Sequence, residues 1–134
     1  MKILYVFLFN ISFILINLNV FSQSIKDSCP KECKIIKISN INDAYLIYVF
    51  VKEVHEYYTI ISLKTNIQEG NKIRKGQHLK LILHSYFDSN IIWRHGTIYP
   101  VTINKTTIFL KEDGRICGNI VLTPNLQGLY YIKP

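Results

Sequence analysis

Residues 44–64 read AYLIYVFVKEVHEYYTIISLK, and this stretch establishes a β fold. Two runs rich in β-branched and aromatic residues, 44–53 and 57–64, predict two strands. Only residues 54–56 separate the runs, and so short a connection favours an antiparallel hairpin. In the first run apolar side chains occupy both sets of alternating positions, so we expect that strand to be covered on both of its faces.

On both sides of this hairpin the chain continues as short strands and polar turns. The most regular alternation is HLKLILHSYF, residues 78–87, which predicts a strand with one core face and one wet face. The basic segment 65–77, which precedes this strand, is expected to be a loop. Residues 101–110 predict either one strand or a hairpin that turns at Asn104-Lys105. Further strands are expected at 34–40, 116–122 and 129–132. In the run 78–87, Leu79, Leu81, Leu83 and Phe87 are expected on the core side, and His78, Lys80, His84 and Tyr86 on the wet side.

The composition excludes an all-helical fold and wholesale disorder. Alanine, the best helix former, occurs once, at Ala44, whereas isoleucine occurs 23 times. Aromatic residues make up 13% of the chain, and disordered chains have few of them. A chain of 134 residues holds one domain. Five to seven short strands predict a small antiparallel all-β domain over residues 34–134, either an oligonucleotide/oligosaccharide-binding (OB)-like barrel or a small sandwich.

Residues 1–22 have the composition of a secretory signal peptide. Lys2 precedes an apolar run that ends at Ser22, the expected cleavage site. The alternative is an uncleaved membrane anchor, because residues 3–21 are nearly long enough to span a bilayer. The run contains three asparagines, and no basic stop-transfer cluster follows it. We therefore expect the leader to be cleaved and the protein to be secreted or periplasmic, in the cell envelope. After cleavage we expect no stable membrane span, and the loss of Lys2 lowers the formal charge from +7 to +6.

The three cysteines predict a disulfide bond, which is the usual state of cysteine in exported proteins. Cys29 and Cys33 lie in an N-terminal segment, residues 23–33, and Cys117 lies far downstream. A bridge from Cys117 to Cys29 or Cys33 would close a long loop and stabilise the fold by about 4 kcal/mol. A local Cys29–Cys33 bridge is the alternative. The spacing fits neither a redox motif nor a zinc site.

Three segments carry a resemblance to a known group of proteins. They read YTIISLK (58–64), KIRKGQHLKLILHSYF (72–87) and GLYYIK (128–133). They resemble short exported bacterial proteins of unassigned function that have an OB-like small β-barrel. The resemblance implies a barrel fold and export, and it brings no catalytic residues with it.

Candidate binding residues form two basic clusters. Lys72, Arg74 and Lys75 lie in the loop before the strand 78–87, and Trp93, Arg94 and His95 place an aromatic ring, a guanidinium and an imidazole together on another loop. Exposed basic groups attract anionic partners. The sequence therefore predicts binding through these clusters, with a merely solvated surface as the alternative.

The sequence contains no recognisable catalytic arrangement. Its carboxylates are scattered, and Glu112 and Asp113 are adjacent in a turn and face apart, so a glycosidase pair is not indicated. We expect a non-enzymatic module, without metal or cofactor, that binds a protein or an envelope glycan. Nucleic acid is not expected, because an exported protein rarely meets it. A structural or assembly component of the envelope is the alternative, and a small hydrolase using His95 is a third reading.

Overall fold

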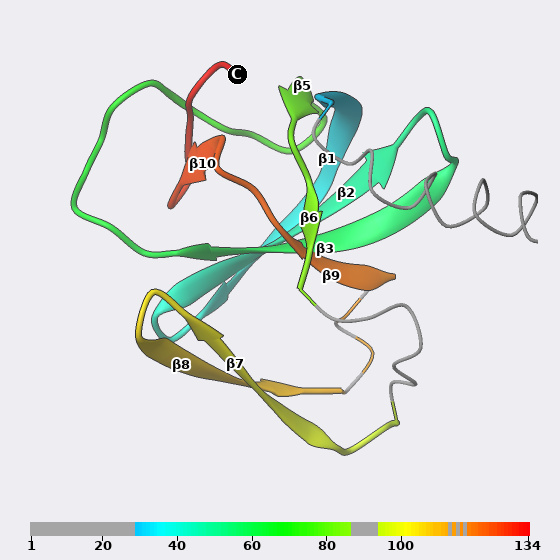
Figure 1. Ribbon diagram of the computed structural model, residues 1–134, viewed down its shortest axis with the longest axis vertical. Helices are drawn as coiled ribbons and strands as arrows, with labels where there is room; N and C mark the ends of the chain where they lie inside the picture. Colours follow the sequence, from blue (N-terminus) through cyan, green and yellow to red (C-terminus); the bar gives the residue numbers. More distant parts are fainter. Residues whose placement is uncertain (1–28, 87–93, 113, 115, 117) are drawn as a thin grey trace, which may run out of the picture.

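The computed structural model describes residues 29–86, 94–112, 114, 116 and 118–134. These residues form eleven short strands and no helix, which confirms the all-β prediction (Figure 1). The expected leader, residues 1–22, lies outside the described residues. The strands are β1 (Lys31–Ile41), β2 (Ala44–Val51), β3 (Glu56–Leu63), β4 (Asn71–Lys72), β5 (His78–Leu81), β6 (His84–Ser85), β7 (Ile98–Ile103), β8 (Thr106–Lys111), β9 (Asn119–Leu122), β10 (Leu126–Gln127) and β11 (Tyr130–Tyr131).

The main sheet has six strands in the order β5-β1-β2-β3-β9-β6. The predicted hairpin is its centre, since β2 pairs antiparallel with β3 from Ala44 opposite Leu63 to Val51 opposite Glu56. The pair β3–β9 is parallel, although the sequence favoured an antiparallel fold throughout. A parallel pair requires a long crossover connection, and the segment from residue 64 to residue 118 supplies it.

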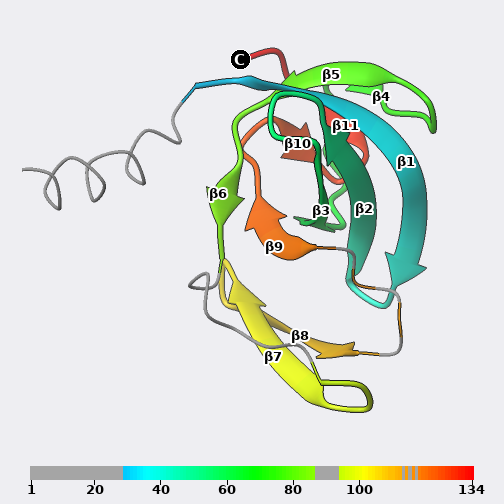
Figure 2. The same ribbon diagram turned by 90° about the vertical axis from the view of Figure 1, so that its right-hand side faces the viewer.

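A single segment, residues 78–85, forms both edges of this sheet. Its first part, β5, pairs with β1, and its second part, β6, pairs with β9. Only Ile82 and Leu83 separate the two parts. We call residues 78–85 the closing segment, because they join the two edges and the sheet curls into a half-barrel (Figure 2). The barrel-like fold predicted from the sequence is therefore confirmed.

The inner face of the curled sheet encloses the larger hydrophobic cluster. Leu79, Leu81 and Leu83 of the closing segment are buried in it, as their alternation predicts; Phe87 lies outside the described residues. A small sheet in the order β10-β11-β4 contributes further side chains to the same cluster. The other members include Cys33, Ile35, Ile47, Val49, Val51, Ile60, Ile73, Val121 and Leu126.

The outer face is covered at one end by the β7–β8 hairpin. Figure 2 shows this hairpin at the end of the sheet where β1 turns into β2. Its side chains form a second buried cluster with outward-facing residues of the main sheet, which explains why β2 is apolar on both faces. The Tyr86 hydroxyl also bonds the backbone of Thr102 in β7, accepting from its N–H at 3.0 Å and donating to its carbonyl oxygen at 3.3 Å. The cluster comprises Ala44, Leu46, Tyr48, Ile61, Val101, Ile108, Leu110 and Ile120.

Several element boundaries differ from the sequence reading. Strand β1 begins at Lys31, so Cys33 belongs to the main sheet and not to a separate N-terminal segment. The run 101–110 is a hairpin, one of the two predicted forms, and it turns at Asn104 and Lys105 with φ of 48° and 67°. Two residues with positive φ are typical of tight type I′ hairpin turns. Within the described residues, no helix is long and apolar enough to cross a bilayer.

Candidate binding surface

The structure separates the two basic clusters predicted from the sequence. Lys72 lies in β4, where it pairs with Tyr130 of β11. Arg94 and His95 are exposed and precede β7, at the base of the β7–β8 hairpin, and Trp93 lies outside the described residues. Figure 2 shows β4 and this hairpin at opposite ends of the molecule. The two clusters therefore do not form one site.

Arg74 and Lys75 lie in an exposed turn against strand β1. The Gly76 N–H donates to the carbonyl oxygen of Ile35 at 2.7 Å, and the Ile35 N–H donates to the carbonyl oxygen of Gln77 at 2.9 Å. These bonds fix the turn beside β1 and lead the chain into β5. The turn therefore lies beside β1 at the β5 edge of the main sheet, just before His78.

Four side chains form a row across this outer face, beyond the end that the β7–β8 hairpin covers. His78 pairs with Lys34, Lys34 with Phe50, and Phe50 with Tyr57, so the row crosses β5, β1, β2 and β3 in turn. Neighbouring strands are about 4.8 Å apart, and directly opposite residues place their side chains on the same face. We call His78, Lys34, Phe50 and Tyr57 the outer row.

The aromatic half of the outer row is a packed cluster that remains open to solvent. The ring centroids of Phe50 and Tyr57 are 5.0 Å apart with an interplanar angle of 55°. The His55 ring, in the β2–β3 turn, lies 6.1 Å from the Phe50 ring. Tyr57 nevertheless remains 53% exposed. Its ring can therefore contact a partner while the Phe50 ring holds it in place.

Two lysines, Lys34 and Lys52, lie beside the Phe50 ring. Glu32 is paired with Lys80, and the Lys52 N–H donates to the Glu32 carbonyl oxygen at 3.2 Å, so these three residues form the next row of the sheet. A shallow depression of about 260 Å³ lies between the two rows, lined by Glu32, Lys34, Phe50, Lys52 and His78. Glu32 is its one acidic residue, and the Glu32 carboxylate lies 3.9 Å from Nδ1 of His78. The lysines therefore give the surface a positive balance.

Local sequence patterns do not predict this surface. Alternation places His78 and Lys80 on a wet face, and both are exposed, but it does not join them to Lys34, Phe50 or Tyr57. The contact between Phe50 and Tyr57 follows from the register of the β2–β3 hairpin. The contact between Lys34 and His78 depends on the pairing of β1 with β5, which no local pattern specifies.

The cysteines described by the structure carry free thiols. Cys29 is exposed and Cys33 is buried, and the two are not bonded to each other. Burial, together with the nearby Glu53 carboxylate, raises the pKa of the Cys33 thiol to about 11. Cys117 lies outside the described residues, and both of its predicted partners, Cys29 and Cys33, are free thiols in this structure, so the predicted disulfide bond is not found there. Among the described residues, no three His, Cys, Asp or Glu side chains lie close enough together to hold a metal ion.

We compared the chain with known protein families, curated proteins and solved structures, and found no relative. The chain matches no protein-family model, and no curated protein and no solved structure matches it. The fold and the surface together define a small all-β protein with a curled sheet and an open aromatic and basic outer face.

Proposed function

We propose that this protein is a non-enzymatic, exported binding module whose outer row binds an anionic envelope glycan. The single observation that carries the proposal is the direct succession of His78, Lys34, Phe50 and Tyr57 across four neighbouring strands. The resemblance of the sequence to exported proteins with small barrels agrees with it. The predicted leader, residues 1–22, would bring the domain into contact with envelope polymers.

The chemistry of the row suits a sugar that carries negative charge. Flat aromatic faces pack against the apolar C–H faces of sugar rings, and the exposed Tyr57 ring is held at its angle by Phe50. Lysine ammonium groups bind carboxylate or phosphate as compact point charges. Lys34 and Lys52 place such charges beside the Phe50 ring, and Lys80 adds a third in the next row of the sheet. A rigid sheet keeps the two kinds of contact at a fixed spacing.

The basic turn at Arg74 and Lys75 extends the same surface. It is bonded to β1 at Ile35, one residue from Lys34. A linear polymer that lies along the outer row would reach this turn at the β5 edge of the sheet. Lys72, Arg94 and His95 have no part in this proposal, because they lie elsewhere on the molecule.

The test is a binding assay with alginate oligosaccharides, which are linear and carry one carboxylate per sugar. Neutral dextran and single-stranded oligothymidylate serve as competing ligand classes. We expect saturable binding to alginate that weakens with salt and no binding to dextran. Phe50→Ala and Tyr57→Ala should each weaken alginate binding by about fivefold, equivalent to about 1 kcal/mol of lost contact. Lys34→Gln should weaken it and reduce its salt dependence.

Matched controls lie on the β7–β8 hairpin. Phe109 is 70% exposed and lies away from the outer row, so Phe109→Ala should leave alginate binding unchanged. Lys111→Gln is the corresponding control for the loss of one charge. Equal losses with Phe109→Ala and Phe50→Ala would refute the proposed surface. Binding to oligothymidylate tighter than to alginate would replace the glycan with single-stranded nucleic acid as the partner.

A further inference from the structure

The β7–β8 hairpin has one buried face and one exposed face. Val101, Ile108 and Leu110 are buried in the second cluster, so that face is turned toward the main sheet. Side chains alternate between the two faces of a strand, and directly opposite residues share a face. The residues that alternate with the buried ones are all exposed. We call them the hairpin face, which consists of the opposed pairs Ile98 with Lys111, Pro100 with Phe109 and Thr102 with Thr107.

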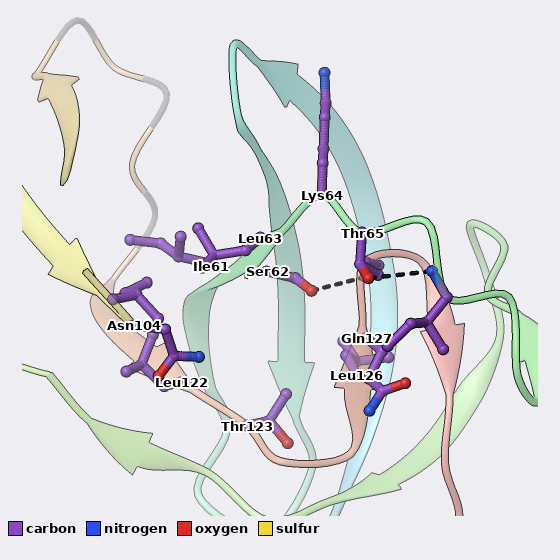
Figure 3. Close-up of a pocket in the computed structure, with 13 residues that line it drawn as sticks. Ile61, Ser62, Leu63, Lys64, Thr65, Asn104, Leu122, Thr123, Leu126 and Gln127 are labelled. Carbon is purple, nitrogen blue, oxygen red and sulfur yellow. Dashed lines mark hydrogen bonds between the residues drawn. The ribbon is translucent and has the colours of Figure 1, made fainter. Parts of the chain in front are cut away.

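The hairpin is anchored to the rest of the domain at its turn and along β7. Asn104, in the turn, lines a cavity together with Leu122 of β9 and Ile61 of β3 (Figure 3). The Tyr86 hydroxyl bonds both the N–H and the carbonyl oxygen of Thr102. These contacts, with the buried cluster beneath the hairpin, keep the hairpin face turned away from the main sheet.

The base and the middle of the hairpin face are apolar. Phe109 is 70% exposed and Ile98 is 58% exposed, and these are the two most exposed large hydrophobic side chains that the structure describes. Pro100 lies directly opposite Phe109 and two residues from Ile98 along the same strand, a distance of about 7 Å. The three side chains therefore form one continuous patch. An exposed apolar patch of this kind marks an interaction surface.

The charged side chains at the two ends of this patch are basic. Lys105 is exposed at the hairpin turn, and Lys111 and Arg94 are exposed at its base. The one carboxylate that the structure describes in the hairpin and its base belongs to Glu112, which is only 9% exposed and accepts a backbone N–H at 2.8 Å; Asp113 lies outside the described residues. The described part of the hairpin therefore presents exposed cations to a partner and no exposed carboxylate.

We infer that the hairpin face docks the protein on the surface of a bilayer that contains anionic lipids. Apolar side chains such as Phe109 and Ile98 enter the boundary between headgroups and acyl chains. Lysine and arginine side chains bind the anionic headgroups while their stems lie along the apolar patch. A second copy docked on the same face would instead bring cations against cations. The hairpin face is separate from the outer row, so this inference does not rest on the proposed glycan binding.

The test is co-sedimentation of the exported protein with lipid vesicles. We expect binding to mixed phosphatidylglycerol and phosphatidylcholine vesicles that weakens with salt, and much weaker binding to phosphatidylcholine alone. Phe109→Ala should weaken binding to the anionic vesicles by about fivefold. Lys111→Gln should also weaken it by about fivefold, because one headgroup contact is lost, and leave binding to phosphatidylcholine unchanged. The predicted leader is apolar, so all variants are compared in one processed form, which mass spectrometry identifies.

A fluorescence measurement locates the contact on the hairpin without regard to the leader. The chain has one tryptophan, Trp93, so Phe109→Trp combined with Trp93→Phe places the only tryptophan on the hairpin face. Its emission should move to shorter wavelength when anionic vesicles are added. Phe50→Trp in the same Trp93→Phe background is the matched reporter on the outer row and should show no change.

The outer row also supplies matched controls for binding, since it too carries an aromatic ring and a lysine. Phe50→Ala and Lys34→Gln should leave vesicle binding unchanged, whereas Phe109→Ala should weaken it. Equal losses in Phe50→Ala and Phe109→Ala, unchanged binding in Phe109→Ala, or no binding to anionic vesicles would each overturn the inference. Self-association in the absence of lipid that Phe109→Ala abolishes would replace the bilayer with a second copy of the chain.

Discussion

Phe50 lies directly opposite Tyr57 in the β2–β3 ladder, with 5.0 Å between their ring centroids and an interplanar angle of 55°. Tilted aromatic pairs at this spacing contribute about 0.5–1.5 kcal/mol beyond the burial of their surfaces. The two rings therefore support the sheet in addition to forming half of the outer row. Their role in stability can be measured separately from their role in binding.

A double-mutant cycle on Phe50 and Tyr57 should reveal this coupling. We expect the losses in the free energy of unfolding for Phe50→Ala and Tyr57→Ala to sum to about 0.5–1.5 kcal/mol more than the loss in the double variant. Urea unfolding provides the three values. Strictly additive losses would show that the two rings do not interact in solution.

Asn125 should be among the most sensitive polar residues in the protein. It is 5% exposed, its side-chain oxygen accepts from the Ile82 N–H at 2.8 Å, and its side-chain nitrogen donates to the Ile132 carbonyl oxygen at 3.1 Å. Asn125→Ala leaves both backbone groups without a partner and should lower the free energy of unfolding by about 2–4 kcal/mol.

The replacement Asn125→Asp separates the two bonds of that side chain. Aspartate keeps the acceptor for Ile82 but faces the Ile132 carbonyl oxygen with a second oxygen, so it should not restore stability at neutral pH. Asn71→Ala, at an exposed position of β4, is the control and should change the free energy of unfolding by less than about 0.5 kcal/mol. Thermal unfolding of the three variants gives the comparison.

Two glycines with positive φ should respond very differently to alanine. Gly118 has a φ of +65°, and a Cβ there would collide with the backbone carbonyl oxygen of Tyr57, at the start of the parallel β3–β9 pair. Gly76 has a φ of +86° with open space around it. Gly76→Ala should therefore cost about 1–2 kcal/mol from its backbone conformation alone, and Gly118→Ala more than about 4 kcal/mol. Similar unfolding midpoints for the two variants would contradict this prediction.

The two described cysteines should differ in reactivity. Cys29 is exposed, whereas Cys33 is buried and the pKa of its thiol is about 11. Because the thiolate is the reactive form, a thiol-alkylating reagent at pH 8 should modify Cys29 in the folded protein and reach Cys33 only after unfolding. Peptide mass mapping before and after addition of urea identifies the modified residue.

The same thiol makes stability depend on alkaline pH. In the unfolded chain the pKa of Cys33 returns to 9.0, below its value of about 11 in the folded protein. The unfolded state therefore loses this proton first, and the contribution of Cys33 to stability, complete below pH 9, declines as the pH rises from 9 to 11. Cys33→Ala should show a shallower decline over that range in urea unfolding. Parallel declines in both proteins would contradict this assignment.

Local patterns predicted the parts of the fold that depend on neighbouring residues. The β2–β3 hairpin, the buried leucines of the closing segment and the Asn104-Lys105 turn all follow from alternation and turn chemistry. The two-residue strands β4 and β10 were missed, because so few residues carry no periodicity. The parallel β3–β9 pair was missed as well, because it joins residues about 60 positions apart, and the alternation of a strand does not specify its distant partner.

The candidate site was harder to predict for the same reason. Charge density drew attention to Lys72, Arg74 and Lys75, but strand register decides which basic residues meet an aromatic ring. Lys34 and Phe50 come together only because β1 pairs with β2 through a register that shifts between Ile35 and Lys37. Tyr57 and His78 are added by two further strands. The outer row is therefore a property of the assembled sheet.

The closing segment also determines how the molecule opens. Because residues 78–85 protect the outer edge of β1 and that of β9 at once, a single local fluctuation that detaches them uncovers two unpaired strand edges together. Amide hydrogens along both edges should then exchange with solvent at one shared opening free energy. We expect this open form to be the one that aggregates, because unpaired strand edges can pair with other chains.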